Sequence, residues 1–246
     1  PSAAVFAILT KVGVYTVLRL WTLCFPATAG ESALFGSSVL VWGGMATLAF
    51  GTVGMLASQQ LGRLAGYSII SSSGTVLAAI GLDLPQLTAG ALFYMASSTL
   101  GVAALFLLAE LVERTRQAEV DPPLPDEPEG RLPMFADYSP LDANLDDQQM
   151  ALVGRAIPAA LAYLAITFLL CTMVLAGLPP LSGFVGKVAM LGALREAGDG
   201  PAGPAARWWL FGLLILSGLS AAIALVRAFI AHFWALQDRP QPRPHL

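Results

Sequence analysis

The chain has 246 residues, of which 56% are hydrophobic and only 12% carry a charged side chain. A soluble protein of this length carries about 25% charged residues, so the composition excludes an ordinary soluble domain and predicts a membrane protein. The formal net charge is -3, which does not favour a nucleic-acid-binding protein.

Apolar segments recur along the chain, each long enough to cross roughly 30 Å of hydrocarbon as a helix. We expect six of them, at residues 3–25, 33–57, 64–82, 87–112, 156–195 and 208–235. Short polar turns separate most of them, and none alternates as the strands of a membrane β-barrel do. The sequence therefore predicts an all-α, polytopic membrane protein with six transmembrane helices.

The first segment carries one of only two lysines in the chain, Lys11, and the fifth carries the other, Lys187. Neither lies in a loop, and a charge at membrane depth costs a few kcal/mol and is typical of proton relays. The alternative is snorkelling, in which the side chain reaches the membrane surface. Lys11 lies about ten residues from either end of its helix, which is deep for snorkelling. We therefore expect both lysines to handle protons, and Arg19 to anchor the helix end or pair with an acid.

Polar residues fall at helical spacing in the third, fourth and fifth segments, so that each set shares one face. These sets are Ser68, Ser71, Ser72 and Thr75; Tyr94, Ser97 and Ser98; and Tyr163, Thr167 and Cys171. Such residues can also simply join helices by hydrogen bonds or close packing, and for each residue alone this alternative stays open. Three such sets beside two buried lysines favour a hydrated proton track. Glu110 would exchange protons with water at the cytoplasmic end of this track. The alternative is an acidic residue at the membrane interface with no part in the track.

The fifth segment is interrupted by LPPLSGFVGK, residues 178–187. Pro179 and Pro180 remove two backbone donors and cannot lie inside a regular helix. A broken helix at membrane depth marks ion or substrate sites in transporters. A loop between two short crossings is the alternative, but residues 183–195 would span only about 20 Å. We therefore expect one discontinuous helix, with a helix N-terminus near Gly183 and Lys187 one turn beyond it.

Residues 113–155 are acidic and rich in proline, and residues 237–246 form a polar tail. A solvated connector is expected over 113–155, and a binding role is the alternative. Arginines set the orientation of a membrane protein, because they are enriched on the cytoplasmic side. One side would hold Arg63, Arg114, Arg116, Arg131, Arg155, Arg239 and Arg243, and the other Arg19, Arg195 and Arg207. This places the connector and the C-terminus in the cytoplasm.

The sequence contains no metal-ligand cluster, nucleophile–base pair or phosphate-binding loop. Cys24 and Cys171 lie in apolar segments and are expected to be packing residues, and His232 and His245 lie near the C-terminal end. We therefore expect no metal, no cofactor and no enzymatic chemistry in this chain. It begins with Pro1 and has no signal peptide, so we expect an internal piece of a longer protein.

Three stretches, ILTKVGVYTVLRLW, YMASSTLGVAALFLLAELVER and AGLPPLSGFVGKVAML, resemble the D-type subunits of bacterial Mrp/Pha-type multisubunit monovalent-cation/proton antiporters. The wider family includes the antiporter-like proton-pumping subunits of respiratory complex I. The resemblance covers nearly the whole chain. It implies a secondary transporter subunit, not an enzyme, in the bacterial inner membrane. Its partners would be lipid, other membrane subunits, protons and either Na⁺ or K⁺.

The resemblance also implies a parent protein with fourteen helices, in which helices four to eight and nine to thirteen form inverted repeats. This chain would correspond to helices eight to thirteen, the C-terminal half of the fold. Residues 1–30 would be the last helix of the first repeat and 31–236 the second repeat. The central lysine of the family falls on Lys11, and the lysine of its broken helix falls on Lys187.

The chain also departs from the family pattern. The glutamate and lysine of the first repeat would precede this chain, so it should not transport alone. Complex I relatives often carry histidine and lysine where this chain has Ser98 and Val102, which favours the antiporter branch. A proton-pumping subunit of NADH-quinone oxidoreductase remains the alternative. The expected proton-translocation residues are Lys11, Lys187, Ser97, Ser98, Tyr94, Ser71, Ser72 and Glu110, with the helix break at Pro179, Pro180 and Gly183.

Overall fold

The computed structural model describes residues 2–120, 159–197 and 203–234, and all regular elements in these ranges are helical. The α-helices are α1 Ser2–Cys24, α2 Ser37–Ala57, α3 Leu61–Gly81, α4 Pro85–Val120, α5 Ala159–Ala176, α6 Ser182–Glu196 and α7 Pro204–Phe229. A short 3-10 helix, η1 Gly30–Ser32, precedes α2, and a π-helix, η3 Ile230–Trp234, continues α7. The predicted all-α class is confirmed.

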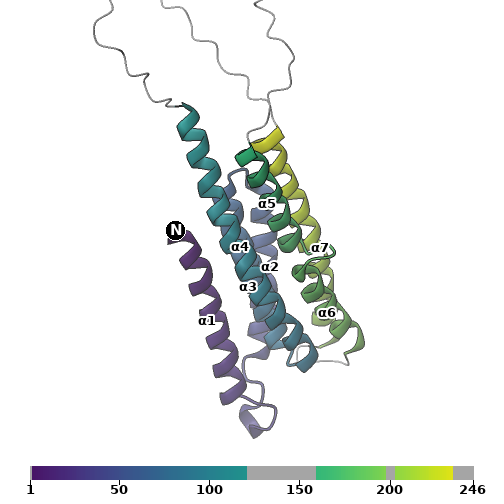
Figure 1. Cartoon of the computed structure of the whole chain (residues 1–246). Coiled ribbons are helices and arrows are strands. Elements are labelled where there is room, and N and C mark those ends of the chain that lie inside the picture. Colours follow the sequence, from purple (N-terminus) through teal and green to yellow (C-terminus); the bar gives the residue numbers. More distant parts are fainter. Residues whose placement is uncertain (1, 121–158, 198–202, 235–246) are drawn as a thin grey trace, which may run out of the picture.

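Five of these helices are long and apolar enough to cross a membrane: α1, α2, α3, α4 and α7. The predicted fifth span, 156–195, is divided between α5 and the 15-residue helix α6. In Figure 1, α6 continues down the bundle from α5 and does not double back. The interruption is therefore that of a discontinuous helix, while the count of six spans stays a prediction.

Helix α4 occupies the centre of the arrangement. It packs against α1 and α3 on one side and against α5 and α6 on the other. Figure 1 shows α1 at one edge of the bundle and the α5–α7 group at the opposite edge. The two helices that carry the lysines, α1 and α6, therefore lie on either side of α4.

Helices α2 and α3 approach each other more closely than ordinary side chains allow. A Cβ atom on Gly44 would collide with the backbone of Ala78, and one on Gly74 with the backbone of Leu48. Glycine is used at such crossings in membrane proteins because it lets two backbones touch. The α2–α3 pair therefore forms a tightly joined unit.

The outer surface of the bundle is apolar over much of its area. On α1, for example, Val5, Leu9, Val12 and Leu23 are each more than half exposed. Surfaces of this kind face lipid or other transmembrane helices, because a soluble protein does not expose such large apolar patches. This is the organisation of a multi-pass membrane protein.

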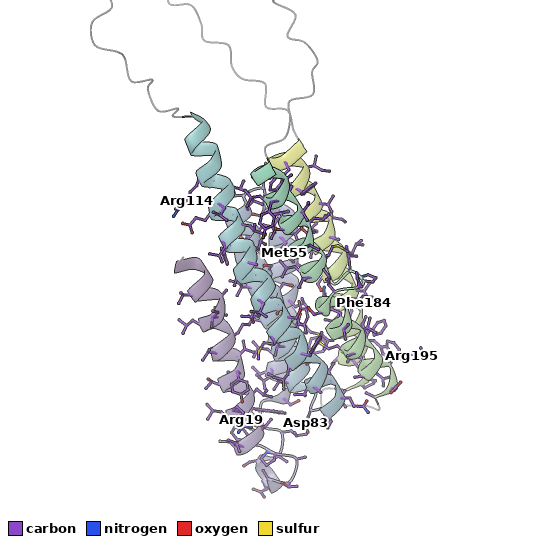
Figure 2. The ribbon with its side chains drawn as sticks, viewed as in Figure 1. Arg19, Met55, Asp83, Arg114, Phe184 and Arg195 are labelled. Atoms are coloured by element: carbon purple, nitrogen blue, oxygen red, sulfur yellow. The ribbon has the colours of Figure 1, made fainter. Side chains whose placement is uncertain are left out.

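The helix ends agree with the predicted alternation of sides. Figure 2 shows Arg19, Asp83 and Arg195 at one end of the bundle and Met55 and Arg114 at the other. The prediction did not count Arg227, which donates hydrogen bonds to the carbonyl oxygens of Leu56 and Ser58 at the Met55 end.

Helix α4 is longer than the apolar segment from which it was predicted. Helix α4 continues past residue 112 to Val120, into the range expected for the solvated connector. Charged residues with good helix propensity, such as Glu113 and Arg114, extend a helix out of the bilayer without a break. The rest of the connector, 121–155, and the tail, 237–246, lie outside the described residues.

Candidate functional site

Lys11 lies in the middle of α1, and its side chain ends inside the bundle. Its Nζ donates hydrogen bonds to Ser72 Oγ at 2.5 Å and Ser73 Oγ at 3.0 Å, both on α3. The residue is only 5% exposed. These contacts do not fit snorkelling, in which the amine would reach the membrane surface. Lys11 is instead held at depth by neutral hydroxyl groups.

Of the two α3 serines expected in the proton track, Ser71 and Ser72, only Ser72 contacts Lys11. Ser72 contacts Lys11, but Ser71 lies against α2, where a Cβ on Gly51 would meet the Ser71 side chain at 2.9 Å. Ser73, which no predicted face included, supplies the second hydroxyl. Positions 71 and 73 lie on nearly opposite sides of a helix, so α3 presents hydroxyls to two neighbours. For Ser71, close packing is therefore the better interpretation.

The helix break has the predicted position. Helix α5 ends at Ala176 and α6 begins at Ser182. Gly177, just past the end of α5, has φ +76°, a left-handed conformation that favours glycine and often terminates helices. Pro179 and Pro180 are exposed on the outer side of the break. Gly183 lies so close to the Val174 carbonyl oxygen that a Cβ atom there would collide with it.

Lys187 points from α6 back towards the end of α5. Its Nζ donates to the carbonyl oxygen of Ala176 at 2.9 Å and approaches that of Leu175 at 3.5 Å. The residue is only 7% exposed. The ring of Tyr94 on α4 lies 5.9 Å from the ammonium, within range of a cation–π interaction. A buried lysine therefore lies next to the break, and the groups that contact its amine are neutral.

Helix α4 joins the break through a second contact. Ser97 Oγ lies 2.7 Å from Ser182 Oγ, at the first residue of α6, and either hydroxyl can donate. Ser98, also buried, donates to the Met95 carbonyl of its own helix at 3.1 Å. Tyr94 and Ser97 therefore face the broken helix, whereas the hydrogen bond of Ser98 stays within α4. Ser182 belongs to no helical periodicity that could have identified it from the sequence.

Two expected residues of the track lie elsewhere. Glu110 forms an ion pair with Arg114 at 2.6 Å, one turn along α4, and the two side chains are 35% and 70% exposed. This supports the interfacial alternative for Glu110. Tyr163 on α5 is 71% exposed, so it faces away from the bundle. Of the row Tyr163, Thr167 and Cys171, only Cys171 is buried, so the row does not face the bundle along its whole length.

Both lysines lack an acidic partner in the part of the chain that the structure describes: their hydrogen bonds go to hydroxyl and carbonyl oxygens. Among the same residues, no group of three or more His, Cys, Asp or Glu side chains could hold a metal ion. An amine among neutral oxygens at membrane depth can accept, hold and release a proton, because several neutral acceptors share the charge when it is present.

Comparison with known proteins identifies the family. The model of the transmembrane region of the NADH:quinone oxidoreductase/Mrp antiporter family matches residues 1–125, half of the chain. The chain belongs to this family. The resemblance that the sequence motifs carry is thereby confirmed. The description of this family names both NADH:quinone oxidoreductase and the Mrp antiporter.

Two relatives in this family are antiporter subunits, both of the D type. The chain is 48% identical over 246 residues to a probable K⁺/H⁺ antiporter subunit of Rhizobium meliloti (strain 1021), covering 99% of this chain and 44% of that protein. It is 27% identical over 245 residues to an Na⁺/H⁺ antiporter subunit of Bacillus subtilis (strain 168), covering 99% and 41%. The chain therefore spans less than half the length of these relatives.

The fold also matches a solved member of the Mrp group. The structure of the Mrp complex from Dietzia sp. DQ12-45-1b contains a chain that superposes with a TM-score of 0.63 at 18% identity. The match covers 95% of this chain and 36% of that one. At this identity the match supports the fold alone, and it places the described helices in an antiporter-like membrane architecture.

Proposed function

We propose that this chain is the proton-translocating part of a subunit in a multisubunit monovalent-cation/proton antiporter. The observation that carries the proposal is that both lysines of the chain end inside the bundle, each on neutral oxygen atoms. Ionisable residues at membrane depth are rare and mark ion or proton pathways. The two relatives described above, named as K⁺/H⁺ and Na⁺/H⁺ antiporter subunits, support the same function.

The proposed route runs across α4. Lys187 exchanges protons with water on the side of the connector, and Tyr94, Ser97 and Ser182 connect the broken helix to α4. Lys11, on the opposite side of α4, receives its hydroxyl contacts from Ser72 and Ser73. Because the two lysines repel each other when both are charged, protonation of one favours release from the other. Water completes the path between the hydroxyl groups.

The proposal includes an arrangement in the membrane. Residues 1–30 end the first of two inverted repeats, and 31–236 form the second, with the 113–155 connector and the 237–246 tail in the cytoplasm. The exposed apolar face of α1, which includes Leu9 and Val12, is then covered by the first repeat. The assembled protein lies in the bacterial inner membrane with other membrane subunits, surrounded by lipid.

The respiratory alternative comes from the family itself, whose description joins antiporters with NADH:quinone oxidoreductase. A complex I subunit would use the same two lysines for proton pumping. The reading frames next to the gene discriminate between the two. Small membrane subunits of an antiporter operon would support the first function, and quinone-reductase subunits the second.

The test is dye-quenching antiport in everted vesicles that contain the full complex. We expect Lys187→Ala and Lys11→Ala each to abolish the cation-dependent release of the pH gradient. Arg63→Ala is the control, because it removes a positive charge from an exposed position near the start of α3. Normal antiport in either lysine variant, at normal complex levels, would overturn the assignment.

A further inference from the structure

An open groove runs between α4 and α6 on the surface of the bundle, and its volume is about 530 Å³. One wall runs along α6 from Val185 to Glu196, and the other along α4 from Gln86 to Phe93. At 1.5 Å per residue the longer wall measures about 16 Å, close to half of the roughly 30 Å of bilayer hydrocarbon. The groove therefore has the depth of one leaflet of the membrane.

The inner part of the groove is apolar and lined by small residues. A Cβ atom on Gly90 of α4 would lie 3.3 Å from the Cβ of Ala189 on α6, so the two helices approach closely there. Gly192, about one turn nearer the end of α6, faces open space, with nothing within 4 Å of a Cβ atom. Phe93 and Val185, both about half exposed, line the deep end. A narrow apolar chain can therefore lie in the groove against both helices.

The other end of the groove is polar. Gln86 lies in the first turn of α4, and Glu196 is the last residue of α6. Figure 2 shows their near neighbours in sequence, Asp83 and Arg195, at the same end of the bundle. Among the described residues, neither Gln86 nor Glu196 has a side-chain hydrogen-bond or ion-pair partner. An amide and a carboxylate at the mouth of the groove are therefore available to a group from outside the chain.

The shape of the groove favours a lipid tail over the helix of a partner subunit. A transmembrane helix crosses both leaflets and is about 10 Å wide with its side chains, whereas this groove spans one leaflet and ends at Phe93 and Val185. An acyl chain is narrow and extends inwards from the membrane surface, where the polar end of the groove lies. Because other lipid tails are as apolar as the groove, a tail gains little by entering it. A preference for one lipid must therefore come from the headgroup.

We propose that the α4–α6 groove binds an acyl chain of a phospholipid whose headgroup carries a primary ammonium, as in phosphatidylethanolamine. The ammonium donates hydrogen bonds to the Glu196 carboxylate and to the side-chain carbonyl oxygen of Gln86, and hydrogen bonds to a carboxylate are among the stronger ones. The phosphate pairs with Arg195, which is exposed in the last turn of α6. The quaternary ammonium of phosphatidylcholine has no N–H to donate, so this lipid binds less tightly.

A lipid in this position touches the two helices that form the lysine site next to the break. Helix α4 meets α6 where the Tyr94 ring lies near the Lys187 ammonium, and again where Ser97 contacts Ser182. The bound tail therefore supports the packing of these helices from the outer surface of the bundle. Lipid binding does not depend on transport, so it can be measured whether or not the proposed proton route is correct.

The first test counts the lipids bound to the purified full complex by mass spectrometry, after exchange into an equimolar mixture of phosphatidylethanolamine and phosphatidylcholine. Gly192→Leu fills the open space in the groove and should remove a phosphatidylethanolamine molecule from each complex. Gly212→Leu is the matched control on α7, since its Cβ also has nothing within 4 Å and it does not line the groove. Equal numbers of bound lipids in the two variants would overturn the proposal.

The second test leaves the packing unchanged, and it decides the proposal also if Gly192→Leu fails to assemble. Phosphatidylethanolamine with a photoactivatable acyl chain is cross-linked to the full complex, and the labelled peptides are identified. We expect label on the groove residues of α4 and α6, with unlabelled phosphatidylethanolamine competing about tenfold better than phosphatidylcholine. Glu196→Gln should remove this difference. Glu31→Gln, which neutralises an exposed acid on η1 outside the groove, should preserve it.

Three outcomes would contradict the proposal. Absence of label from the groove peptides would show that no lipid tail lies there. Equal competition by the two lipids in the unmodified complex would show that the headgroup is not recognised. If Gly192→Leu lost a membrane subunit that Gly212→Leu retained, the groove would hold a helix of that subunit and not a lipid.

Discussion

The hydroxyl oxygens of Ser97 on α4 and Ser182 at the start of α6 lie 2.7 Å apart, which couples the central helix to the broken one. If the contact carries protons or holds the break in place, either Ser97→Ala or Ser182→Ala should slow antiport. A net hydrogen bond of about 1 kcal/mol corresponds to about fivefold in rate. The double variant should be no slower than the slower single variant, because the same contact is lost.

Ser98→Ala is the control for this comparison of single and double variants, since the Ser98 hydroxyl donates its hydrogen bond to the Met95 carbonyl of its own helix. Initial rates of dye recovery in vesicles with matched complex levels are the measurement. Strictly additive effects of Ser97→Ala and Ser182→Ala would show that the two hydroxyls act independently.

The two hydroxyl groups that bind Lys11, those of Ser72 and Ser73, should contribute unequally to the rate of antiport. Ser72→Ala removes the shorter of its two hydrogen bonds and Ser73→Ala the longer one, at 2.5 Å and 3.0 Å. A hydrogen bond to a charged group contributes about 1.5–3 kcal/mol, so we expect Ser72→Ala to slow antiport by about tenfold or more and Ser73→Ala by less. Loss of both should slow it further.

Ser68→Ala provides the comparison on the same helix, because its hydroxyl is buried and donates to the Ala65 carbonyl one turn back. Equal effects of Ser68→Ala and Ser72→Ala on antiport would mean that the serines of α3 act only in helix packing.

Gly183 permits the close approach that shapes the break. Gly183→Ala would place a methyl group on the Val174 carbonyl oxygen, and overpacking of this kind costs about 1–3 kcal/mol or more. We expect a lower yield of assembled complex and a lower melting temperature in detergent. Gly192→Ala on the same helix has nothing within 4 Å of its new Cβ and should be neutral or slightly stabilising. Matching melting curves for the two variants would contradict the observed contact.

Glu110 should tolerate neutralisation. Its carboxylate is partly exposed and pairs with Arg114 on the same helix, away from both lysine sites as their contacts define them. Glu110→Gln should therefore retain nearly full antiport across the pH range in the vesicle assay. If Glu110→Gln instead reduced antiport as much as Lys187→Ala, Glu110 would belong to the proton track.

The features that local sequence determines were predictable. A lysine in an apolar segment and a pair of prolines within a span are visible without any tertiary information, because their physical cost does not depend on neighbours. The buried positions of Lys11 and Lys187 and the break at 177–181 are found as expected. The family resemblance rested on the same motifs.

The partners of these residues were harder to predict, because they depend on which helix lies opposite. Helix α3 is buried on nearly all sides, so its hydroxyls do not form one inward face: Ser71 meets α2 and Ser73 meets α1. The contacts of Arg227 were not predictable, because the carbonyl groups that accept its hydrogen bonds, at the end of α2, are distant in sequence. Helical periodicity indicates which residues share a face but not what that face contacts.

The close packing of α2 and α3 limits how the Lys11 site can move. With backbones in contact at Gly44 and Gly74, neither helix can slide or rotate past the other without a collision. The hydroxyls of Ser72 and Ser73 are thus mounted on a fixed support. If transport requires the Lys11 amine to leave these hydroxyls, either the lysine side chain must change its conformation or α1 must move relative to α3.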